Sequence, residues 1–298
     1  MNRLLRTYGH GHFIEESYDM PNVCDDEITV KTLLTGICRS DIDMMNGNFP
    51  ILPASMQGHE GLGLVIDVGV NLKSAVKVGD IVATRGEPAF ADYYNVRINE
   101  FVVVPDVNPK YIIEPVACGL NILDQAKHEV MKRVDSNKRI IIFGSGFLAW
   151  VVYNYIKFHN FPNEITIVGN SNINLWGDLL SKEFGGKFDI VIDLSGRTDI
   201  LNLDIYNKES LLILGNQKML TSDFSKLLWQ ACTIIFPSPR HSNFYKCMQD
   251  AVSLIEKDYL NVDNFWTKGY NRNTEWQQAF TDSVNRTNGF NRAYLKWV

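Results

Sequence analysis

The stretch IIIFGSGFLA at residues 140–149 decides the fold, because it sets a glycine turn between an apolar strand and an apolar helix. The first glycine of this Gly-x-Gly-x-x-Ala pattern permits a tight turn, and the second lets backbone N–H groups approach a pyrophosphate. The small third residue lets helix and strand pack closely, and the helix N-terminus attracts phosphate. The stretch therefore predicts a dinucleotide site whose cofactor-binding residues are Gly144, Ser145, Gly146, Phe147 and Leu148.

The chain on the C-terminal side of this turn alternates between predicted strands and predicted helices. Strands are expected at 139–143, 164–168, 188–194, 209–214 and 232–236, and helices at 147–158, 175–184 and 222–231. Such alternation predicts a doubly wound parallel sheet. It also favours dinucleotide binding over the alternative that the glycines form an ordinary tight turn.

The end of the second predicted strand bears on cofactor preference. NAD sites usually carry Asp or Glu there to bind the ribose 2′-hydroxyl, whereas this chain has Gly169, Asn170 and Ser171. The missing acid leaves room for a 2′-phosphate, although no Arg or Lys is adjacent. We therefore assign these three residues to the cofactor site and expect NADP or NAD, with a slight preference for NADP.

The N-terminal third of the chain is β-rich instead. Short β-branched runs at 28–34, 63–68, 80–84 and 101–104 are separated by Gly, Pro, Asn and Asp. Several short strands with intervening turns predict a compact barrel-like or sandwich domain. Beyond it, a helical stretch is expected at 115–134. Near the C-terminus, a helix is expected at 244–257 and a strand at 292–297.

Two residue clusters in the β-rich part carry metal-binding side chains. They are Gly-Ile-Cys-Arg-Ser-Asp at 36–41 and Gly-His-Glu-Gly at 58–61, and Glu114 follows later. A catalytic zinc takes three protein ligands and keeps one position open, and Cys, His and carboxylate ligands suit it. Singly, a cysteine is usually a small buried hydrophobe, and a histidine beside glycines can be hydrogen-bonded in a turn. Together, Cys38, His59 and Glu114 predict one catalytic zinc.

The clusters resemble those of the medium-chain dehydrogenase/reductase superfamily, in its zinc-dependent alcohol and polyol dehydrogenase branch. The segment at 35–41 resembles the loop of the first zinc ligand, and the segment at 58–60 that of the second. Glu114 resembles the third ligand of the polyol subgroup, in which Glu replaces Cys. The resemblance covers nearly the whole chain. It implies an α/β protein with a GroES-like catalytic domain at 1–120, a Rossmann domain at 121–237 and a return to the catalytic domain at 238–298.

The resemblance also implies roles for individual residues. The three zinc ligands would be Cys38, His59 and Glu114. Asp41 would orient the histidine, and Glu60 would lie beside the metal as a supporting group or an alternate ligand. Ser40 would pass on the proton of the substrate, and Arg39 could reach the cofactor pyrophosphate.

Two departures from the family pattern modify these expectations. The link from Asp80 to Phe90 contains no cysteine, so the four-cysteine lobe that holds a structural zinc in many members is missing. We therefore expect one zinc at most. Asp43 stands where the proton relay of alcohol dehydrogenases often ends in a histidine, so the relay of this chain should differ.

Composition indicates a globular protein of 298 residues, with 45% hydrophobic and 21% charged residues. The net charge of −5 argues against nucleic acid as a partner. The five cysteines are scattered without Cys-x-x-Cys, which favours a reducing, cytoplasmic location. No apolar signal segment begins the chain, and the uncharged stretch 140–156 is shorter than the ~20 residues that span a bilayer. We therefore expect no membrane association.

These observations predict an enzyme that transfers a hydride between an alcohol or polyol, or its carbonyl product, and NAD(P). Two alternatives stay open, namely a zinc-free NADPH-dependent quinone or enone reductase of the same superfamily and a non-catalytic NAD(P)-binding protein. The family implies a homodimer formed by the edge strands of two Rossmann sheets. The apolar run at 232–236 supports this, because an open sheet edge must be covered or paired.

Overall fold

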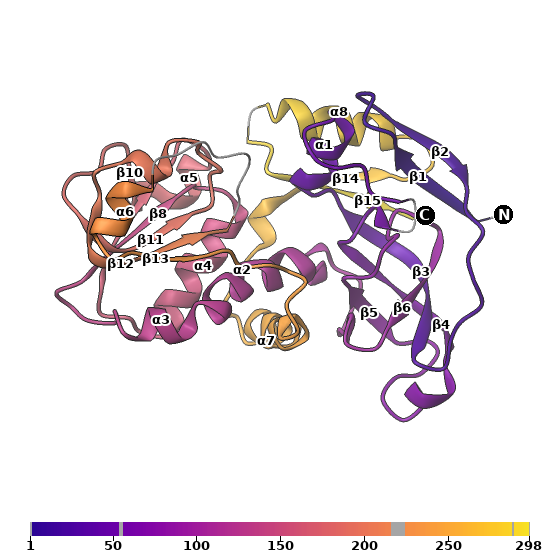
Figure 1. The fold of residues 1–298 in the computed structure, drawn as a ribbon. Helices are drawn as coiled ribbons and strands as arrows, with labels where there is room; N and C mark the ends of the chain where they lie inside the picture. Colours follow the sequence, from indigo (N-terminus) through magenta and orange to yellow (C-terminus); the bar gives the residue numbers. More distant parts are fainter. Residues whose placement is uncertain (1, 54–55, 216–223, 288, 298) are drawn as a thin grey trace. The chain divides into compact units, whose positions relative to one another are not determined.

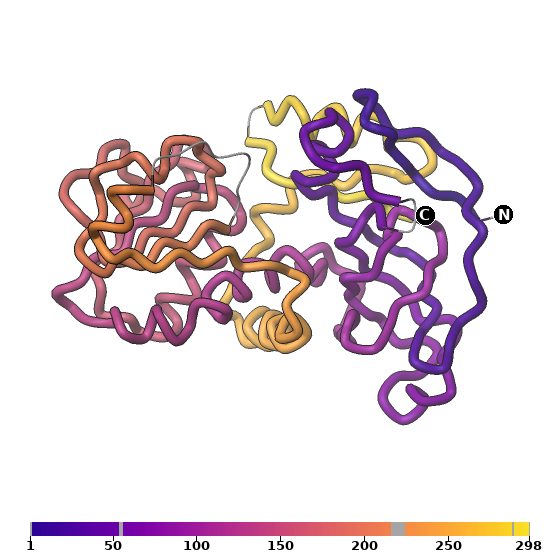
Figure 2. Tube along the Cα trace, in the orientation of Figure 1, coloured from indigo at the N-terminus to yellow at the C-terminus, as the bar shows by residue number. Residues whose placement is uncertain are grey.

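The computed structural model describes residues 2–53, 56–215, 224–287 and 289–297. The chain divides into two compact units, which Figures 1 and 2 show as ribbon and tube. One unit contains Met1–Pro115 together with Met248–Val298, and the other contains Val116–Cys247. The first unit is therefore assembled from both ends of the chain, and the second from its middle.

The first unit is built on a seven-stranded sheet of order β14-β15-β3-β4-β5-β7, in which β6 pairs with β3. Its strands are β3 (Glu27–Gly36), β4 (Gly61–Val68), β5 (Ile81–Thr84), β6 (Tyr93–Arg97), β7 (Phe101–Val103), β14 (Trp266–Asn271) and β15 (Arg292–Lys296). A separate pair contains β1 (Arg3–Thr7) and β2 (Phe13–Ser17). Ile28 and Val30 of β3 are buried in a core cluster with residues of β4, β5 and β6. The expected β-rich domain is confirmed.

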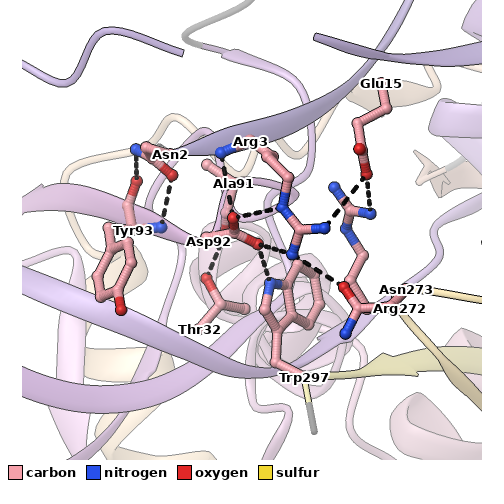
Figure 3. Close-up of polar contacts among 10 residues, drawn as sticks. All are labelled: Asn2, Arg3, Glu15, Thr32, Ala91, Asp92, Tyr93, Arg272, Asn273 and Trp297. Carbon is pink, nitrogen blue, oxygen red and sulfur yellow. Dashed lines mark hydrogen bonds and ion pairs between the residues drawn. The ribbon is translucent and has the colours of Figure 1, made fainter. Parts of the chain in front are cut away.

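Polar contacts join β1 to the end of the sheet, as Figure 3 shows. The Asp92 carboxylate accepts hydrogen bonds from Arg3 Nε at 2.9 Å and from Trp297 Nε1 at 2.9 Å. Arg3 Nη2 also donates to Asn273 Oδ1 at 2.8 Å. One largely buried carboxylate thus holds together segments from both ends of the chain.

Two helices of the first unit were not expected from the sequence. They are α1 (Arg39–Met45), which follows β3, and α8 (Trp276–Asn285), and the two contact each other. Helical segments before β8 and after β13 also include η2 (Val70–Leu72), η3 (Pro109–Tyr111), α2 (Glu114–Gln125), α3 (Lys127–Met131), α7 (Phe244–Glu256) and η6 (Asp263–Phe265). None of the helices in the described part of the chain is long and apolar enough to cross a membrane.

The second unit contains a six-stranded parallel sheet of order β10-β9-β8-β11-β12-β13. Its elements are β8 (Arg139–Phe143), α4 (Phe147–Phe158), β9 (Glu164–Val168), β10 (Leu180–Ser181), β11 (Phe188–Asp193), η5 (Ile200–Asn202), β12 (Tyr206–Leu214), α6 (Ser225–Trp229) and β13 (Thr233–Ile235). Numbered along the chain, the strands run 3-2-1-4-5-6, the order of a dinucleotide-binding doubly wound sheet. Isoleucines of β8 and β11 are buried on both faces, as in parallel sheets covered by helices. The expected fold class is confirmed.

The helix expected at 175–184 is wrong. A short helix, α5 (Ile173–Trp176), and a turn, η4 (Gly177–Leu179), lead instead into β10. Leu180 pairs with Ile167 of β9, so sheet pairing replaces the helix that the apolar spacing indicated. The first residues of the helix expected at 222–231 lie outside the described residues, and α6 occupies residues 225–229 of that range.

Candidate functional site

Cys38, His59 and Glu60 form the candidate metal site of the first unit. One ligand atom from each residue lies within 4.8 Å of the other two. Cys38 stands between β3 and α1, whereas His59 and Glu60 immediately precede β4. Because β3 and β4 are antiparallel neighbours, and Gly36 N donates to Glu60 O at 2.9 Å, the end of one strand lies beside the start of the next. The sheet thus joins two clusters that are separate in sequence.

The glycine before Cys38 makes this close approach possible. A Cβ atom at position 36 would lie 2.1 Å from Glu60 Oε2 and 3.0 Å from the Trp266 ring. Because packed interiors leave no room for such contacts, any side chain at Gly36 would displace the Glu60 carboxylate. The glycine therefore belongs to the geometry of the site.

Asp41 is a buried carboxylate that contacts both the cysteine and the histidine segment. Its Oδ2 accepts a hydrogen bond from Cys38 N at 2.8 Å, and its Oδ1 lies 3.8 Å from His59 Nδ1. Burial raises the pKa of Asp41 to about 6, against the attraction of His59. Burial opposes the charged form of His59, but Asp41 and a hydrogen bond with Cys38 outweigh it and raise the pKa of His59. A carboxylate on the Nδ1 side leaves the other ring nitrogen for a metal.

Glu60 is paired with an arginine from the last strand. Arg292, at the start of β15, donates from Nη2 to both carboxylate oxygens of Glu60. The guanidinium carbon lies 4.9 Å from the ring centroid of Trp266, within reach of a cation–π contact. Burial opposes the charge of Arg292, but Glu60 and Cys38 outweigh it and raise the pKa of Arg292. The Glu60 carboxylate is therefore held beside the metal-binding atoms by a second charge.

Glu114 begins α2 and is buried, with 4% of its surface exposed. Its charge attracts both His59 and Arg292, so it belongs to the same region. The residues gathered within 4.8 Å, however, include Glu60 and not Glu114. The first unit thus offers a thiol, an imidazole and two carboxylates, and this donor set fits Zn²⁺.

The remaining residues expected at this site lie on α1. Ser40 is half-buried in the first turn of the helix. Arg39 begins the helix, and its Nε lies 3.2 Å from Asp43 Oδ1, one turn later. Asp43, at the position where a relay histidine is common, is therefore committed to an ion pair with Arg39.

The glycine turn of the second unit lies at the point where the strand order reverses. β8 has β9 on one side and β11 on the other, and ligands of doubly wound sheets bind at such a point. Gly144 N donates to Val168 O at 2.8 Å, and Gly146 caps the N-terminus of α4. Phe147 is buried and Leu148 half-buried in the first turn of α4. The turn therefore presents a helix N-terminus at the position that a dinucleotide pyrophosphate requires.

Ser145 fastens the end of β9 to the glycine turn. Its Oγ lies 3.0 Å from Ser171 Oγ and accepts Ser171 N at 3.0 Å. Its carbonyl accepts Asn172 Nδ2 at 2.8 Å and Trp176 Nε1 at 3.0 Å. A Cβ atom on Gly169 would lie 2.3 Å from Ser145 Oγ, so only glycine fits there. Of the three residues expected near the ribose 2′ position, Asn170 is an exposed side chain that is free of this network.

Three residues of these sites were not expected from the sequence, namely Arg292, Asn172 and Trp176. Asn172 directly follows the segment assigned to the cofactor, so a polar side chain just after a strand was an available signal. Arg292 is distant from both metal motifs in sequence and reaches Glu60 only because β15 pairs with β3. No local pattern could have identified it.

Comparisons with known proteins agree with this geometry. The alcohol dehydrogenase GroES-like domain family matches residues 24–106. The chain is 25% identical to a D-arabitol-phosphate dehydrogenase of Enterococcus avium, over 92% of this chain and 90% of that protein. It superposes on a short chain alcohol dehydrogenase from E. coli complexed with NADH, with a TM-score of 0.79, 15% identity and 99% coverage of both chains. For S. aureus TarJ in complex with NADPH, the TM-score is 0.77 at 18% identity, covering 100% of this chain and 99% of that one.

The GroES-like match spans β3 to β7 in the first unit, and the similar proteins extend over both units. The strand order of the second unit and its glycine turn are those of a dinucleotide-binding domain. The resemblance noted in the sequence motifs is thereby confirmed. The chain is an enzyme that contains an alcohol dehydrogenase GroES-like domain, and over both units it is similar to alcohol and polyol dehydrogenases of the medium-chain dehydrogenase/reductase superfamily.

Proposed function

We propose that this NAD(P)-dependent oxidoreductase holds one zinc ion and interconverts an alcohol or polyol and its carbonyl product. The observation that carries the proposal is the gathering of Cys38, His59 and a carboxylate within 4.8 Å, with Asp41 behind the histidine. The polyol assignment follows the D-arabitol-phosphate dehydrogenase to which the chain is similar. The proposed location is the cytoplasm, on the cysteine pattern.

Cys38, His59 and Glu114 are the proposed zinc ligands. Glu60 lies closer to the first two, but Arg292 holds both of its carboxylate oxygens. Using Glu60 as a ligand would therefore break a buried ion pair, which is costly. Glu60 suits an alternate role in which its carboxylate moves toward the metal when a ligand leaves.

When bound, zinc would supply a Lewis acid that lowers the pKa of the substrate hydroxyl or polarises the carbonyl. Ser40 accepts the hydroxyl proton and releases its own proton toward solvent. NAD(P), when bound at the glycine turn, would supply the hydride acceptor for the carbon that bears the hydroxyl, which would leave a carbonyl product. Asp41 holds the His59 ring in place through this cycle, and the Asp43–Arg39 pair leaves the outer proton path to water.

The cofactor is proposed to bind the turn of residues 144–148 with its pyrophosphate at the N-terminus of α4. Proteins of this fold have been solved with NADH and with NADPH. The lack of an acid at residues 169–171 supports a slight preference for NADP.

The test combines metal analysis with turnover. Purified protein should contain about one zinc per chain, and absorbance at 340 nm should change with a panel of polyols and ketoses. Cys38→Ser should lose both zinc and turnover, while Cys24→Ser, at an exposed cysteine, should keep both. Turnover of quinones or enones by zinc-free protein would instead establish the zinc-free reductase. NAD(P) binding without turnover of any substrate would establish a binding protein.

A further inference from the structure

Three arginines from separate elements lie beside the candidate metal site. Arg39 begins α1, Arg286 ends α8, and Arg292 begins β15. The two helices contact each other, and β15 pairs with the strand that leads to Cys38. Because α1 and α8 contact each other and β15 lies beside β3, the three guanidinium groups share one region, which also contains the Asp43 carboxylate and the Cys38 thiol.

Two of these arginines have a carboxylate partner. Arg39 pairs with Asp43 at 3.2 Å, and Arg292 pairs with Glu60. Within the described part of the chain, no carboxylate lies within ion-pair distance of Arg286. Its Nε donates to Ser283 O at 3.3 Å, and its residue is exposed. Its two terminal nitrogens remain available to a ligand that carries negative charge.

The backbone at Arg286 is unfavourable for an arginine. The residue ends α8 with φ 44° and ψ 49°, in the left-handed region. Glycine and asparagine are preferred at this helix position, because a Cβ atom is strained there. The need to end the helix therefore does not explain why an arginine stands at this position. Strained residues concentrate at binding sites, where the side chain has a task that offsets the strain.

We propose that Arg286 binds a phosphate group on the substrate, so that the enzyme acts on phosphorylated polyols or the corresponding ketose phosphates. The inference rests on the proposed function, because it requires a substrate whose hydroxyl reaches the metal site while its phosphate reaches Arg286 in the same unit. A guanidinium presents paired N–H donors that match phosphate oxygens, and it stays charged at every physiological pH. The neighbouring Arg39 is paired with Asp43, so the charge of Arg286 itself would favour a dianion over a neutral polyol.

The experiment compares a pentitol with its 5-phosphate and a hexitol with its 6-phosphate. Wild-type enzyme should have a kcat/KM for each ester at least about 10-fold above that for the parent polyol. Arg286→Gln should lower the value for the esters by about 10- to 100-fold and leave the parent polyols unchanged. Arg286→Lys should retain part of the preference. Arg97→Gln removes an exposed arginine of the same unit, paired with Glu27, and should behave as wild type.

A second measurement separates binding from structure and from catalysis. Calorimetric titration with the pentitol 5-phosphate should give a Kd that rises in Arg286→Gln, while the Kd of NAD(P)H stays constant. Arg286→Gly removes the guanidinium and also relieves the backbone strain. The Tm of this variant should therefore not fall, although its binding of the ester should weaken.

Three results would overturn the inference: equal kcat/KM for ester and parent in wild type, an equal loss for both in Arg286→Gln, or a changed Kd for NAD(P)H with ester binding intact. If no polyol or ester is turned over but the titration shows ester binding that depends on Arg286, the proposed function is wrong and the phosphate-binding role of Arg286 is supported.

Discussion

Asp41 links the two halves of the candidate metal site through its two carboxylate oxygens. One oxygen fixes the backbone of Cys38, and the other faces the His59 ring. The metal-binding side chains lie in short local motifs, so Cys38, His59 and Asp41 could be proposed as site residues from the sequence. The Glu60–Arg292 pair could not be, because nothing in either local segment indicates that β15 lies beside β3.

Replacing Asp41 with Asn should weaken zinc binding by about 10- to 100-fold, because the ring of His59 loses the carboxylate that orients it. The Asn carbonyl can still accept the hydrogen bond from Cys38 N, so the fold should persist. Competition with a chelator measures the affinity, and circular dichroism checks the fold. Asp43→Asn, whose carboxylate faces Arg39, is the matched control and should keep wild-type affinity. Equal losses in both variants would remove the assigned role of Asp41.

At the level of elements, the strands that were predicted correctly have strong local signals. β8 and β11 contain the apolar runs 140–143 and 190–192, and β3 is rich in β-branched residues. The missed elements lack such signals. α1 has only seven residues and follows Cys38 directly, whereas β6 depends on pairing with β3 along the register Ile28–Val96. Tertiary pairing therefore decided these elements.

The end of β9 should set cofactor preference through Asn170. Asn170→Asp places a carboxylate on an exposed side chain just after the strand, where it would repel a 2′-phosphate and attract a ribose hydroxyl. The ratio of kcat/KM for NADP to that for NAD should fall by about 10-fold or more, since one charge–charge contact is worth about 1–3 kcal/mol. Gly169 is unsuitable for this test, because a Cβ atom there would collide with Ser145. An unchanged ratio would place the ribose elsewhere.

The contacts of β1 with Asp92 should make stability depend on pH. Burial opposes ionisation of Asp92, but hydrogen bonds from Arg3 and Trp297 outweigh it and lower the pKa of Asp92. A lowered folded-state pKa means that the stabilisation is complete above the unfolded pKa of about 3.9 and is lost as pH falls through the folded value. At pH 7, Asp92→Asn should cost about 1–3 kcal/mol of unfolding free energy.

Urea denaturation of wild type and Asp92→Asn measures this difference across pH. The gap should narrow as pH falls below about 4, because Asp92 then becomes protonated first in the unfolded chain and, at lower pH, in the folded protein as well. Asp19→Asn alters an exposed carboxyl group and should track wild type throughout. A gap that stays constant with pH would assign the effect to packing rather than to the charge of Asp92.

At the level of the whole molecule, the sequence predicted which chemistry each unit carries. It did not predict which residues from distant elements complete each site. The metal motifs and the glycine turn are local, so they could be read directly. The arginines beside the metal site come from α8 and β15, near the far end of the chain, and acquire meaning only in the folded first unit. The oligomeric state is likewise a feature that local motifs do not indicate, because it depends on the surface of the folded chain.

The second unit should mediate a homodimer. Among the strands that the structure describes, β13 ends the sheet and pairs with β12 alone, and an open strand edge must be paired or covered. α6 leads into it and exposes two large apolar side chains, Leu228 at 77% and Trp229 at 85%, and Phe236 beyond the strand is exposed at 64%. A second copy could cover this surface with the same strand in reverse sense, as two-fold symmetry requires.

Sedimentation at micromolar concentration should therefore report a dimer for the wild-type protein. Trp229→Asp places a charge in the proposed interface and should raise the dimer dissociation constant by at least about 10-fold, since burying an unpaired charge is costly. Val78→Asp alters an apolar residue of the first unit that is 62% exposed, so it should leave the dimer intact. Dissociation in the Val78 variant alone would move the interface to the first unit. A monomeric wild-type protein would show that the apolar surface of α6 and β13 serves some other contact.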